Sequence, residues 1–215
     1  MKRFLFLFLA FGLPVISTAQ SHFRPGFVVS INGDTTRGLI DLRGWDQNPD
    51  AIKFKKDKNS PVQQFTVDDI NYFSIDKIKS YIKYTGRISL DNINENHVLD
   101  FRDTTFKVAS VFLRILQKGK YLALYSYSDA IKTRFYIGEQ PDYKPTELVY
   151  RLYYDMDAVT ETHGRTVNED TYMKQLYSLA LKYNALTPSL QSDIEQAGYR
   201  QYYINQIVKA INSAH

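Results

Sequence analysis

The sequence predicts an α+β protein, in which a mostly antiparallel β-sheet, folded as a sandwich or a partly open barrel, is followed by a C-terminal helical segment of two to three helices. From residue 27 to about residue 155, short runs of alternating or β-branched residues are separated by Gly, Asn, Asp and Pro. From residue 166 onward, apolar residues recur at helical spacing. We therefore expect a β-rich domain over residues 20–157 and a helical segment over residues 158–215 that packs on it.

The first residues have the pattern of an export signal. Lys2 and Arg3 precede an uncharged apolar run that ends at Ile16, and the small residues Ser-Thr-Ala follow. This order predicts a signal peptide over residues 1–19 with cleavage before Gln20, an uncleaved N-terminal anchor being the alternative. The run is shorter than the about 20 residues of a spanning helix, and no later stretch approaches that length, so we expect no integral membrane segment in the mature chain.

Composition excludes several classes of function. The chain has no cysteine, which rules out disulfides, thiolate metal sites, thiol catalysis and a lipoprotein anchor. Its 27 basic and 23 acidic residues give no indication of a nucleic-acid partner. The histidines lack metal-ligand spacing, and no nucleophile, phosphate or dinucleotide motif is present, so we expect no metal, no cofactor and no catalytic residue. The scattered histidines are His22, His97, His163 and His215.

The first two strands are expected at residues 27–31 and 35–42. Asn32-Gly33-Asp34 lies between them and predicts a tight turn, because Asn and Gly accept the positive φ that such a turn requires. Gly38 permits a bulge or a close approach of another chain segment. Further strands are expected at residues 51–56, 62–66, 71–75, 79–84, 97–102, 133–138 and 147–154.

Lysines alternate with Ile52 and Phe54 in the strand at residues 51–56. This pattern indicates a half-buried strand with a solvated row of lysines, which also hinder unwanted strand addition where they lie on a sheet edge. Contact with a glycan phosphate or an anionic surface is the functional alternative.

The clearest hairpin is expected within residues 111–128. If Lys118-Gly119 forms a two-residue turn, Ile115 faces Leu122 and Leu113 faces Leu124, and such cross-strand pairs stabilise one register. A helix over the same residues is the alternative. Glycine in its middle and two tyrosines near its end make the strands more favourable.

Three helices account for the residues after Thr166. Asn168 is placed to cap the first, Thr187 and Pro188 begin the second, and Gly198 ends it. Two apolar stripes indicate the faces that pack on the sheet. The stripes comprise Tyr172, Leu176, Leu179, Ala180 and Tyr183 in the first helix, and Tyr203, Ile204, Ile207, Val208 and Ile211 in the last.

An ordered series of short motifs occupies residues 26–75. It comprises Gly26-Phe27-Val28, Asn32 to Thr35, Gly38 to Asp41, Trp45 to Pro49, Ile52 to Lys55 and Thr66 to Ile70. In this order the motifs resemble the N-terminal module of a family of exported Bacteroidota proteins without an established activity. Many members continue into an outer-membrane β-barrel, which we do not expect here because helical residues follow. The resemblance implies an exported, β-rich envelope protein.

Two sets of residues are candidates for function. Asp68-Asp69 and Asp155-Met156-Asp157 could supply the paired carboxylates of a glycoside hydrolase. For Asp68-Asp69 we prefer the alternative interpretation, in which these residues are the short hydrogen-bond acceptors of a turn or a helix start. Asp41, Arg43 and Trp45 form a possible ligand-binding corner, with Trp45 either a sugar-stacking platform or, as we prefer, an apolar plug beneath two exposed corner charges.

We therefore expect an exported cell-envelope binding or assembly module without catalytic activity, located in the periplasm or at the periphery of the outer membrane. Its partner would be an envelope protein or a glycan. The alternatives are a glycan-directed periplasmic hydrolase that uses paired carboxylates, and a structural partner of an outer-membrane complex.

Overall fold

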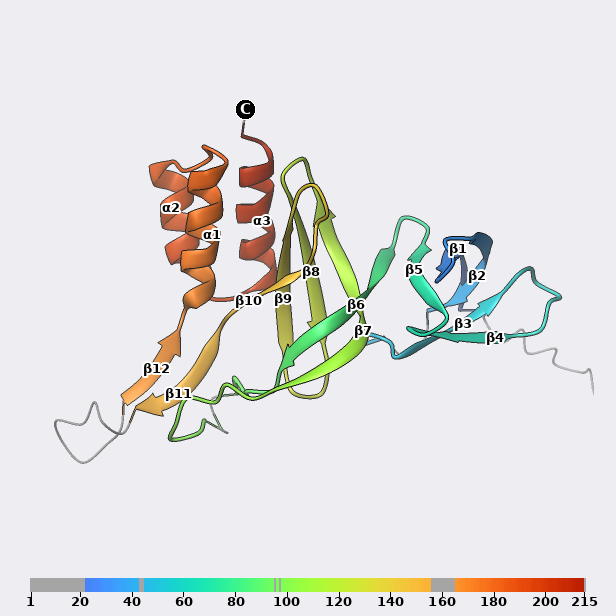
Figure 1. Cartoon of the computed structure of the whole chain (residues 1–215), viewed down its shortest axis with the longest axis horizontal. Helices are drawn as coiled ribbons and strands as arrows, with labels where there is room; N and C mark the ends of the chain where they lie inside the picture. The colour runs from blue at the N-terminus through green and yellow to red at the C-terminus, as the bar shows by residue number, and fades with distance from the viewer. Residues whose placement is uncertain (1–21, 43–44, 95, 97, 156–164, 215) are drawn as a thin grey trace, which may run out of the picture.

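The computed structural model describes residues 22–42, 45–94, 96, 98–155 and 165–214 (Figure 1). One sheet of ten strands has the order β10-β9-β8-β7-β6-β5-β1-β2-β3-β4, and all its neighbouring pairs are antiparallel. The predicted α+β class with a mostly antiparallel sheet is confirmed. The strands of this sheet are β1 (Phe23–Ser30), β2 (Thr35–Asp41), β3 (Ala51–Lys55), β4 (Gln63–Thr66), β5 (Ile70–Ile75), β6 (Lys79–Ser89), β7 (Phe106–Lys118), β8 (Leu122–Ser128), β9 (Thr133–Glu139) and β10 (Thr146–Leu148).

A separate hairpin and three helices follow the large sheet. The hairpin consists of β11 (Arg151–Asp155) and β12 (Arg165–Glu169), and the helices are α1 (Thr171–Lys182), α2 (Pro188–Glu195) and α3 (Gln201–Asn212). The helices thus begin after a further strand, and β12 lies beyond the boundary expected between residues 157 and 158. No helix in the described part of the chain is long and apolar enough to cross a membrane.

The turn at Asn32-Gly33-Asp34 is confirmed. Gly33 has φ of 92°, and the Ser30 amide donates to the Asp34 carbonyl at 2.9 Å. Gly38 also behaves as expected, because a Cβ atom there would collide with the Lys55 carbonyl and the Phe54 ring. β3, to which both residues belong, is the second strand from the edge, which is formed by β4.

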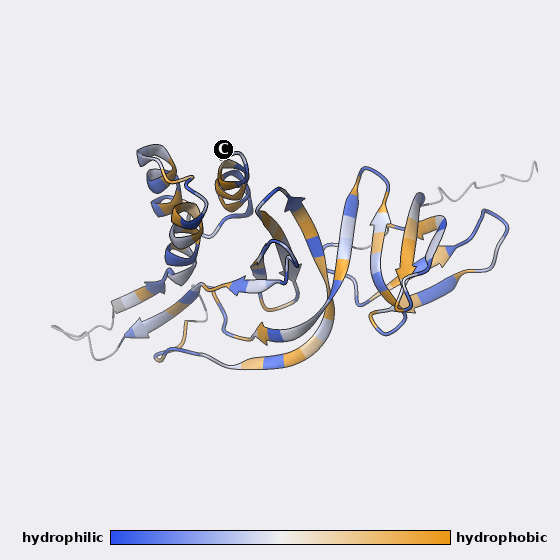
Figure 2. Ribbon diagram, turned by 45° about the horizontal axis from the view of Figure 1, so that its top comes forward, coloured by the Kyte–Doolittle hydropathy of each residue, from blue (hydrophilic) through white to orange (hydrophobic). Residues whose placement is uncertain are grey.

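The sheet encloses three apolar clusters. One lies in the lobe formed by β1 to β5 and the adjoining parts of β6 and β7, and contains Phe73, Tyr81 and Phe112. The other two lie on opposite faces of β6 to β10: Tyr125 and Tyr136 occupy the inner face, whereas the opposite face packs against the helices. Figure 2 shows the long β6–β7 ribbon bending around the inner face. Half of the sheet is thus curled, although it does not close.

The strand expected at residues 97–102 does not form. Leu99 makes only an isolated parallel bridge with Tyr153. The side chains of Asn92, Asn94 and Asp103 each accept a hydrogen bond from a backbone amide two residues on, which favours turns over an extended ladder. The strands that flank this connection are instead longer than expected, β6 at its end and β7 at its beginning.

The β7–β8 hairpin forms, but in a different register from the one predicted. Ile115 faces Tyr125 rather than Leu122, and the register shifts between Ile115 and Gln117. The turn lies at Lys120-Tyr121 rather than at Lys118-Gly119, since the Gly119 amide donates to the Leu122 carbonyl at 2.9 Å. A distant residue completes it: the Asn212 carbonyl oxygen accepts hydrogen bonds from the amides of Tyr121 and Leu122, at 3.0 and 2.8 Å.

Helix boundaries follow the predicted signals except at one cap. Asn168 does not cap α1, because it pairs with Leu152 inside the β11–β12 hairpin and Asp170 occupies the cap position. Thr187 caps α2 as predicted, its hydroxyl accepting from the Leu190 amide at 3.1 Å. Gly198 lies after α2 with φ of 59°. Most of the predicted apolar stripe of α3 is buried; Tyr203 is exposed.

Candidate functional site

The corner proposed from the sequence lies beside the first apolar cluster. The half-buried Trp45 ring packs edge-on against Phe73 and Tyr81, with centroid distances of 5.8 and 5.7 Å. Asp41 is buried rather than exposed, and Arg43 lies outside the described residues. Asp41 and Trp45 line a cavity of about 260 Å³ with Lys53. Trp45 therefore packs against the apolar cluster, which favours an apolar plug over a sugar-stacking platform.

The first pair of candidate carboxylates forms a turn. The Asp69 carboxylate accepts hydrogen bonds from the Thr66 amide at 2.7 Å and the Thr66 hydroxyl at 2.8 Å, and these bonds lower the pKa of Asp69. A general acid needs a raised pKa instead. Of the second candidate group, Asp155 is described and pairs within β11–β12, whereas Met156 and Asp157 lie outside the described residues.

A more developed site lies where β6 and β10 approach each other across the curled half of the sheet. A cavity of about 390 Å³ separates the two strands. Its polar lining combines two guanidinium groups, a carboxylate, hydroxyl groups and a carboxamide. The lining residues are Tyr84, Arg87, Ser89, Thr104, Thr105, Phe106, Pro145, Thr146, Glu147, Val149, Arg151 and Gln175.

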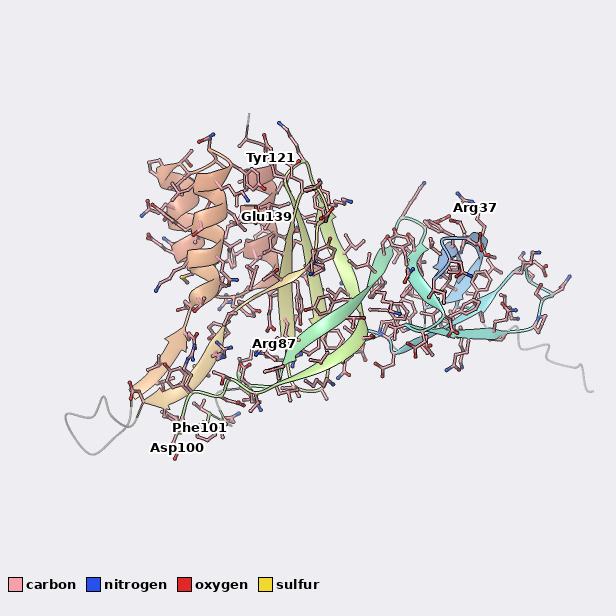
Figure 3. The ribbon with its side chains drawn as sticks, viewed as in Figure 1. Arg37, Arg87, Asp100, Phe101, Tyr121 and Glu139 are labelled. Atoms are coloured by element: carbon pink, nitrogen blue, oxygen red, sulfur yellow. The ribbon has the colours of Figure 1, made fainter. Side chains whose placement is uncertain are left out.

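One wall of this cavity is a strand edge. β7 pairs with β6 as far as Ser89, but β5 pairs with β6 only as far as Ile82. Over residues 83–89, β6 therefore has one paired edge and, within the described part of the chain, no strand on the other. The β6 and β7 segments continue here as a two-stranded ribbon, which is seen in Figure 3 with Arg87 near its end.

The hydrogen-bond pattern identifies the backbone groups on the free edge. The Leu90 amide donates to the Thr105 carbonyl at 3.0 Å, so the even-numbered residues of this stretch direct their backbone groups toward β7. Because the direction alternates along a strand, Thr85, Arg87 and Ser89 direct their N–H and C=O groups away from β7, toward the cavity side.

Side chains satisfy two of these groups. The Ser89 carbonyl accepts from Arg134 Nε at 2.7 Å, and the Arg87 carbonyl accepts from the Tyr84 hydroxyl at 3.4 Å. The backbone groups of Thr85 and the amide of Arg87 find no hydrogen-bond partner among the described residues. The opposite wall differs, because Gln175 covers the edge of β10: its carboxamide donates to the Glu147 carbonyl and accepts from the Val149 amide.

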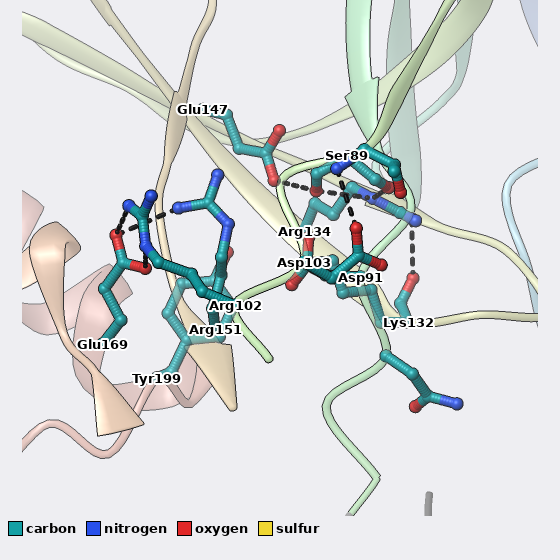
Figure 4. A network of polar contacts seen from close by, with 12 residues as sticks. Ser89, Asp91, Arg102, Asp103, Lys132, Arg134, Glu147, Arg151, Glu169 and Tyr199 are labelled. Carbon is teal, nitrogen blue, oxygen red and sulfur yellow. Dashed lines mark hydrogen bonds and ion pairs between the residues drawn. The ribbon is translucent and has the colours of Figure 1, made fainter. Parts of the chain in front are cut away.

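A buried polar network lies behind the cavity (Figure 4). The Ser89 hydroxyl donates to Glu147 Oε1 at 2.5 Å, and this contact joins the end of β6 to β10. Arg134 is 0 % exposed and holds an ion pair with Asp129 at 3.0 Å. It also donates to the Lys132 carbonyl. One guanidinium thus connects β6, β9 and the turn before β9.

A second buried ion pair adjoins this network. Lys132 Nζ lies 2.6 Å from Asp91 Oδ2, and both side chains are 2 % exposed. Burial lowers the pKa of Lys132, and the bond to Asp91 opposes that shift. Removing one partner of such a pair leaves an uncompensated buried charge, so the pair fixes the position of the loop after β6.

Several buried polar atoms of this region have no partner among the described residues. They include the Tyr136 hydroxyl, Arg134 Nη2 and Asp91 Oδ1. Tyr136 faces Glu147 in the β9–β10 ladder, and its ring centroid lies 5.3 Å from that of Tyr84. Burial and the charge of Glu147 raise the pKa of both tyrosines, which therefore remain neutral hydrogen-bond donors. Buried polar atoms without partners are typical of sites that accept a ligand or water.

Cationic side chains lie around the cavity mouth. The Arg87 guanidinium stacks 3.5 Å from the centroid of the Phe106 ring and has no ion-pair partner among the described residues. Arg151 and Arg102 instead share Glu169, at 3.0 and 2.6 Å. Of the two guanidinium groups that line the cavity, Arg87 is therefore the one without an ion-pair partner in the described structure, and the aromatic ring limits its orientations.

A further cavity of about 460 Å³ lies between β9 and α1. Its carboxylates are Glu139 and Asp142. Burial alone would raise the pKa of Glu139, but hydrogen bonds from Lys182 and Tyr183 outweigh it and lower the pKa. This carboxylate therefore stays ionised and joins the sheet to α1.

Sequence reasoning missed the β6–β10 cavity. The strand predicted at residues 79–84 is shorter than β6, which continues to Ser89, and the buried Ile88 continues the alternation of Ile82 and Tyr84. Among the described residues, no group of three or more metal-ligating side chains occurs.

Comparison of the chain with protein-family models, curated proteins and solved structures finds no match.

Proposed function

We propose that this chain is an exported binding module of the cell envelope, which holds a segment of an envelope protein or glycan in the cavity between β6 and β10 and catalyses no reaction. The observation that carries this proposal is the combination of a free strand edge with an adjoining polar cavity. The volume of this cavity, about 390 Å³, falls within the roughly 300–1,000 Å³ of small-ligand sites.

The polar groups of the cavity are suited to recognition. Arg87 offers free donors at the mouth, whereas Ser89 and Glu147 hydrogen-bond each other at the back. The Tyr136 hydroxyl, which has no partner in the described structure, lies next to this back wall. A ligand with several oxygen atoms would give the Arg87 donors at the mouth hydrogen-bond partners.

The export part of the proposal rests on the first 19 residues and on the resemblance of residues 26–75 to an exported module. A hydrolase is less well supported. Glu147 is the one carboxylate among the described residues that line the β6–β10 cavity, and glycoside hydrolysis requires two. The nearby Glu169 is already bound by Arg102 and Arg151.

Site-specific photo-crosslinking tests this proposal. A photoreactive residue at Thr105, which is exposed and lines the cavity, would be compared with one at Tyr202, which is exposed on α3. After incubation with bacterial envelope fractions, we expect adducts at position 105 that Arg87→Ala reduces. Equal adduct formation at both positions, unchanged by Arg87→Ala, would contradict binding at this cavity.

A further inference from the structure

The free edge of β6 has a geometry that another polypeptide backbone can satisfy. Thr85 presents its N–H and C=O groups and Arg87 its N–H group, at the two-residue spacing of a β-ladder, while the Arg87 carbonyl accepts from the Tyr84 hydroxyl. A glycan offers no matching series of alternating donors and acceptors, whereas an extended peptide pairs with such an edge by main-chain hydrogen bonds.

The topology also leaves room for one more antiparallel strand. β6 to β10 are five consecutive antiparallel strands, so β6 and β10 run in the same sense along the sheet. They could pair directly only as parallel strands; instead, the Ser89 side chain of β6 hydrogen-bonds Glu147 of β10. Gln175 of α1 covers the edge of β10, so an added strand would pair with β6. A strand inserted beside β6 would run antiparallel to both.

Charge indicates the composition of such a strand. Thr85 and Arg87 have the same parity on β6, so they face the same side of the sheet, and Arg87 lies opposite Val108 of β7. An acidic side chain at the matching position of an added strand would reach the free Arg87 guanidinium and accept two hydrogen bonds from it. No carboxylate of the described chain occupies that position.

We infer that the ligand of this cavity is an extended acidic segment of a partner protein, which adds as an antiparallel strand to residues 83–87 of β6. This inference rests on the proposed function and names its ligand class. The Ser89–Glu147 hydrogen bond blocks the far end of the cavity and limits the added strand to the stretch before Ser89.

Proline substitution tests strand addition on the protein side. The probe is a short, end-blocked peptide of alternating Glu and Thr, titrated into the mature chain by calorimetry. Thr85→Pro removes an amide that points away from β7, and we expect peptide binding about tenfold weaker. Thr85→Ala controls for the hydroxyl, which contacts Ser110 Oγ.

Val108→Pro is the matched control on the other edge of the same ribbon. Phe112 directs its carbonyl away from β6, toward Asn48, so Val108, of the same parity, also directs its amide away from β6. We expect Val108→Pro to leave peptide binding unchanged. Equal affinity of Thr85→Pro and the unmodified chain would overturn strand addition, and crosslinking at Thr105 would then still test the proposed function separately.

A modified peptide makes the test independent of variant folding. Two peptides would be compared, one N-methylated at its odd-numbered residues and the other at its even-numbered residues. Only one of these two sets of amides faces β6, so the peptide that lacks this set of donors should bind far more weakly than the other. Bound peptide should also slow amide hydrogen exchange at Thr85 and Arg87. Arg87→Gln should weaken the Glu-Thr peptide without affecting a Gln-Thr peptide. Failure of the Glu-Thr peptide to bind at millimolar concentration would overturn the inference.

Discussion

The side-chain amide of Asn48 donates a hydrogen bond to the carbonyl of Phe112 at 2.7 Å, although 64 positions separate the two residues. The same nitrogen donates to the Ser126 carbonyl at 3.1 Å, and the Asn48 carbonyl oxygen accepts from the Ser128 amide. Asn48 therefore occupies the point where β7 and β8 separate and supplies the hydrogen bonds that a continued ladder would have made.

Asn48→Ala should destabilise the fold. It leaves two carbonyl groups and one amide without these partners, and we expect a loss of about 3 kcal/mol in the free energy of unfolding. Urea unfolding would measure it. Asn48→Asp is the matched comparison, since it keeps the acceptor for Ser128 but places an oxygen against the carbonyls of Phe112 and Ser126. Stability of both variants equal to that of the unmodified chain would show that water replaces Asn48 without cost.

Trp45→Ala distinguishes a plug from a ligand platform. Because the ring packs edge-on against Phe73 and Tyr81, its loss should lower the free energy of unfolding by roughly 3 kcal/mol, the low end for large aromatic deletions, since the ring is only half-buried. Trp45→Phe should recover part of this loss. Thermal melting measures the effect, and a Trp45→Ala protein that melts like the unmodified chain would contradict the plug.

Local patterns predicted the parts of the fold that neighbouring residues decide. Asn32-Gly33 predicted a turn because these residue types accept a positive φ, and Gly33 has one. Thr187 predicted the start of α2, and its hydroxyl caps the helix. The apolar stripe that includes Ile204 and Ile207 is buried in the cluster that unites helices and sheet. In each case the decisive interaction lies within the element itself or in its periodicity.

Long-range contacts decided what the sequence did not reveal. The β7–β8 turn depends on Asn212, which lies 91 positions after Tyr121. The β6–β10 cavity is closed at its end by Ser89 and Glu147, which are 58 positions apart. Asn212, Ser89 and Glu147 belong to no local sequence motif. No periodicity in the sequence indicates that the ends of two strands meet after the sheet curls.

The ion pairs of Glu169 should make stability depend on acid pH. The hydrogen bond from Arg102 lowers the pKa of Glu169 below its ordinary value of 4.5; burial opposes the shift and the charge of Arg151 adds to it. A carboxylate whose pKa is lower in the folded state stabilises the fold above its unfolded pKa, and this contribution is lost as pH falls through the folded pKa.

Glu169→Gln should therefore cost about 1 kcal/mol at neutral pH, a modest value because Arg102 is half-exposed. The difference between the two proteins should shrink below the ordinary pKa of 4.5. Urea unfolding at a series of pH values measures the difference, and a constant difference across the acid range would contradict this assignment.

Asn212→Ala should loosen the turn between β7 and β8. The Asn212 side chain accepts from the amides of Tyr121 and Leu122 and donates to the Leu122 carbonyl at 3.1 Å. We expect a loss of about 2 kcal/mol and faster amide exchange at Tyr121. Asn205→Ala is the milder comparison, since Gln117 keeps its bond to the Asn205 carbonyl when the side chain is lost.

Truncation after Val167 tests whether helices and sheet fold as one unit. Tyr199 lies between them: its hydroxyl donates to the Leu148 carbonyl at 2.8 Å and accepts from the Phe135 amide at 3.2 Å. Burial raises the pKa of this hydroxyl, which remains neutral.

Without the helices, Leu122, Leu124 and the other residues of that sheet face would be exposed as an apolar patch. We expect aggregation or a broad melting transition, measured by calorimetry and size-exclusion chromatography. A truncated chain that stays monomeric with a sharp, unshifted transition would show that the β-strands are stable without the helices.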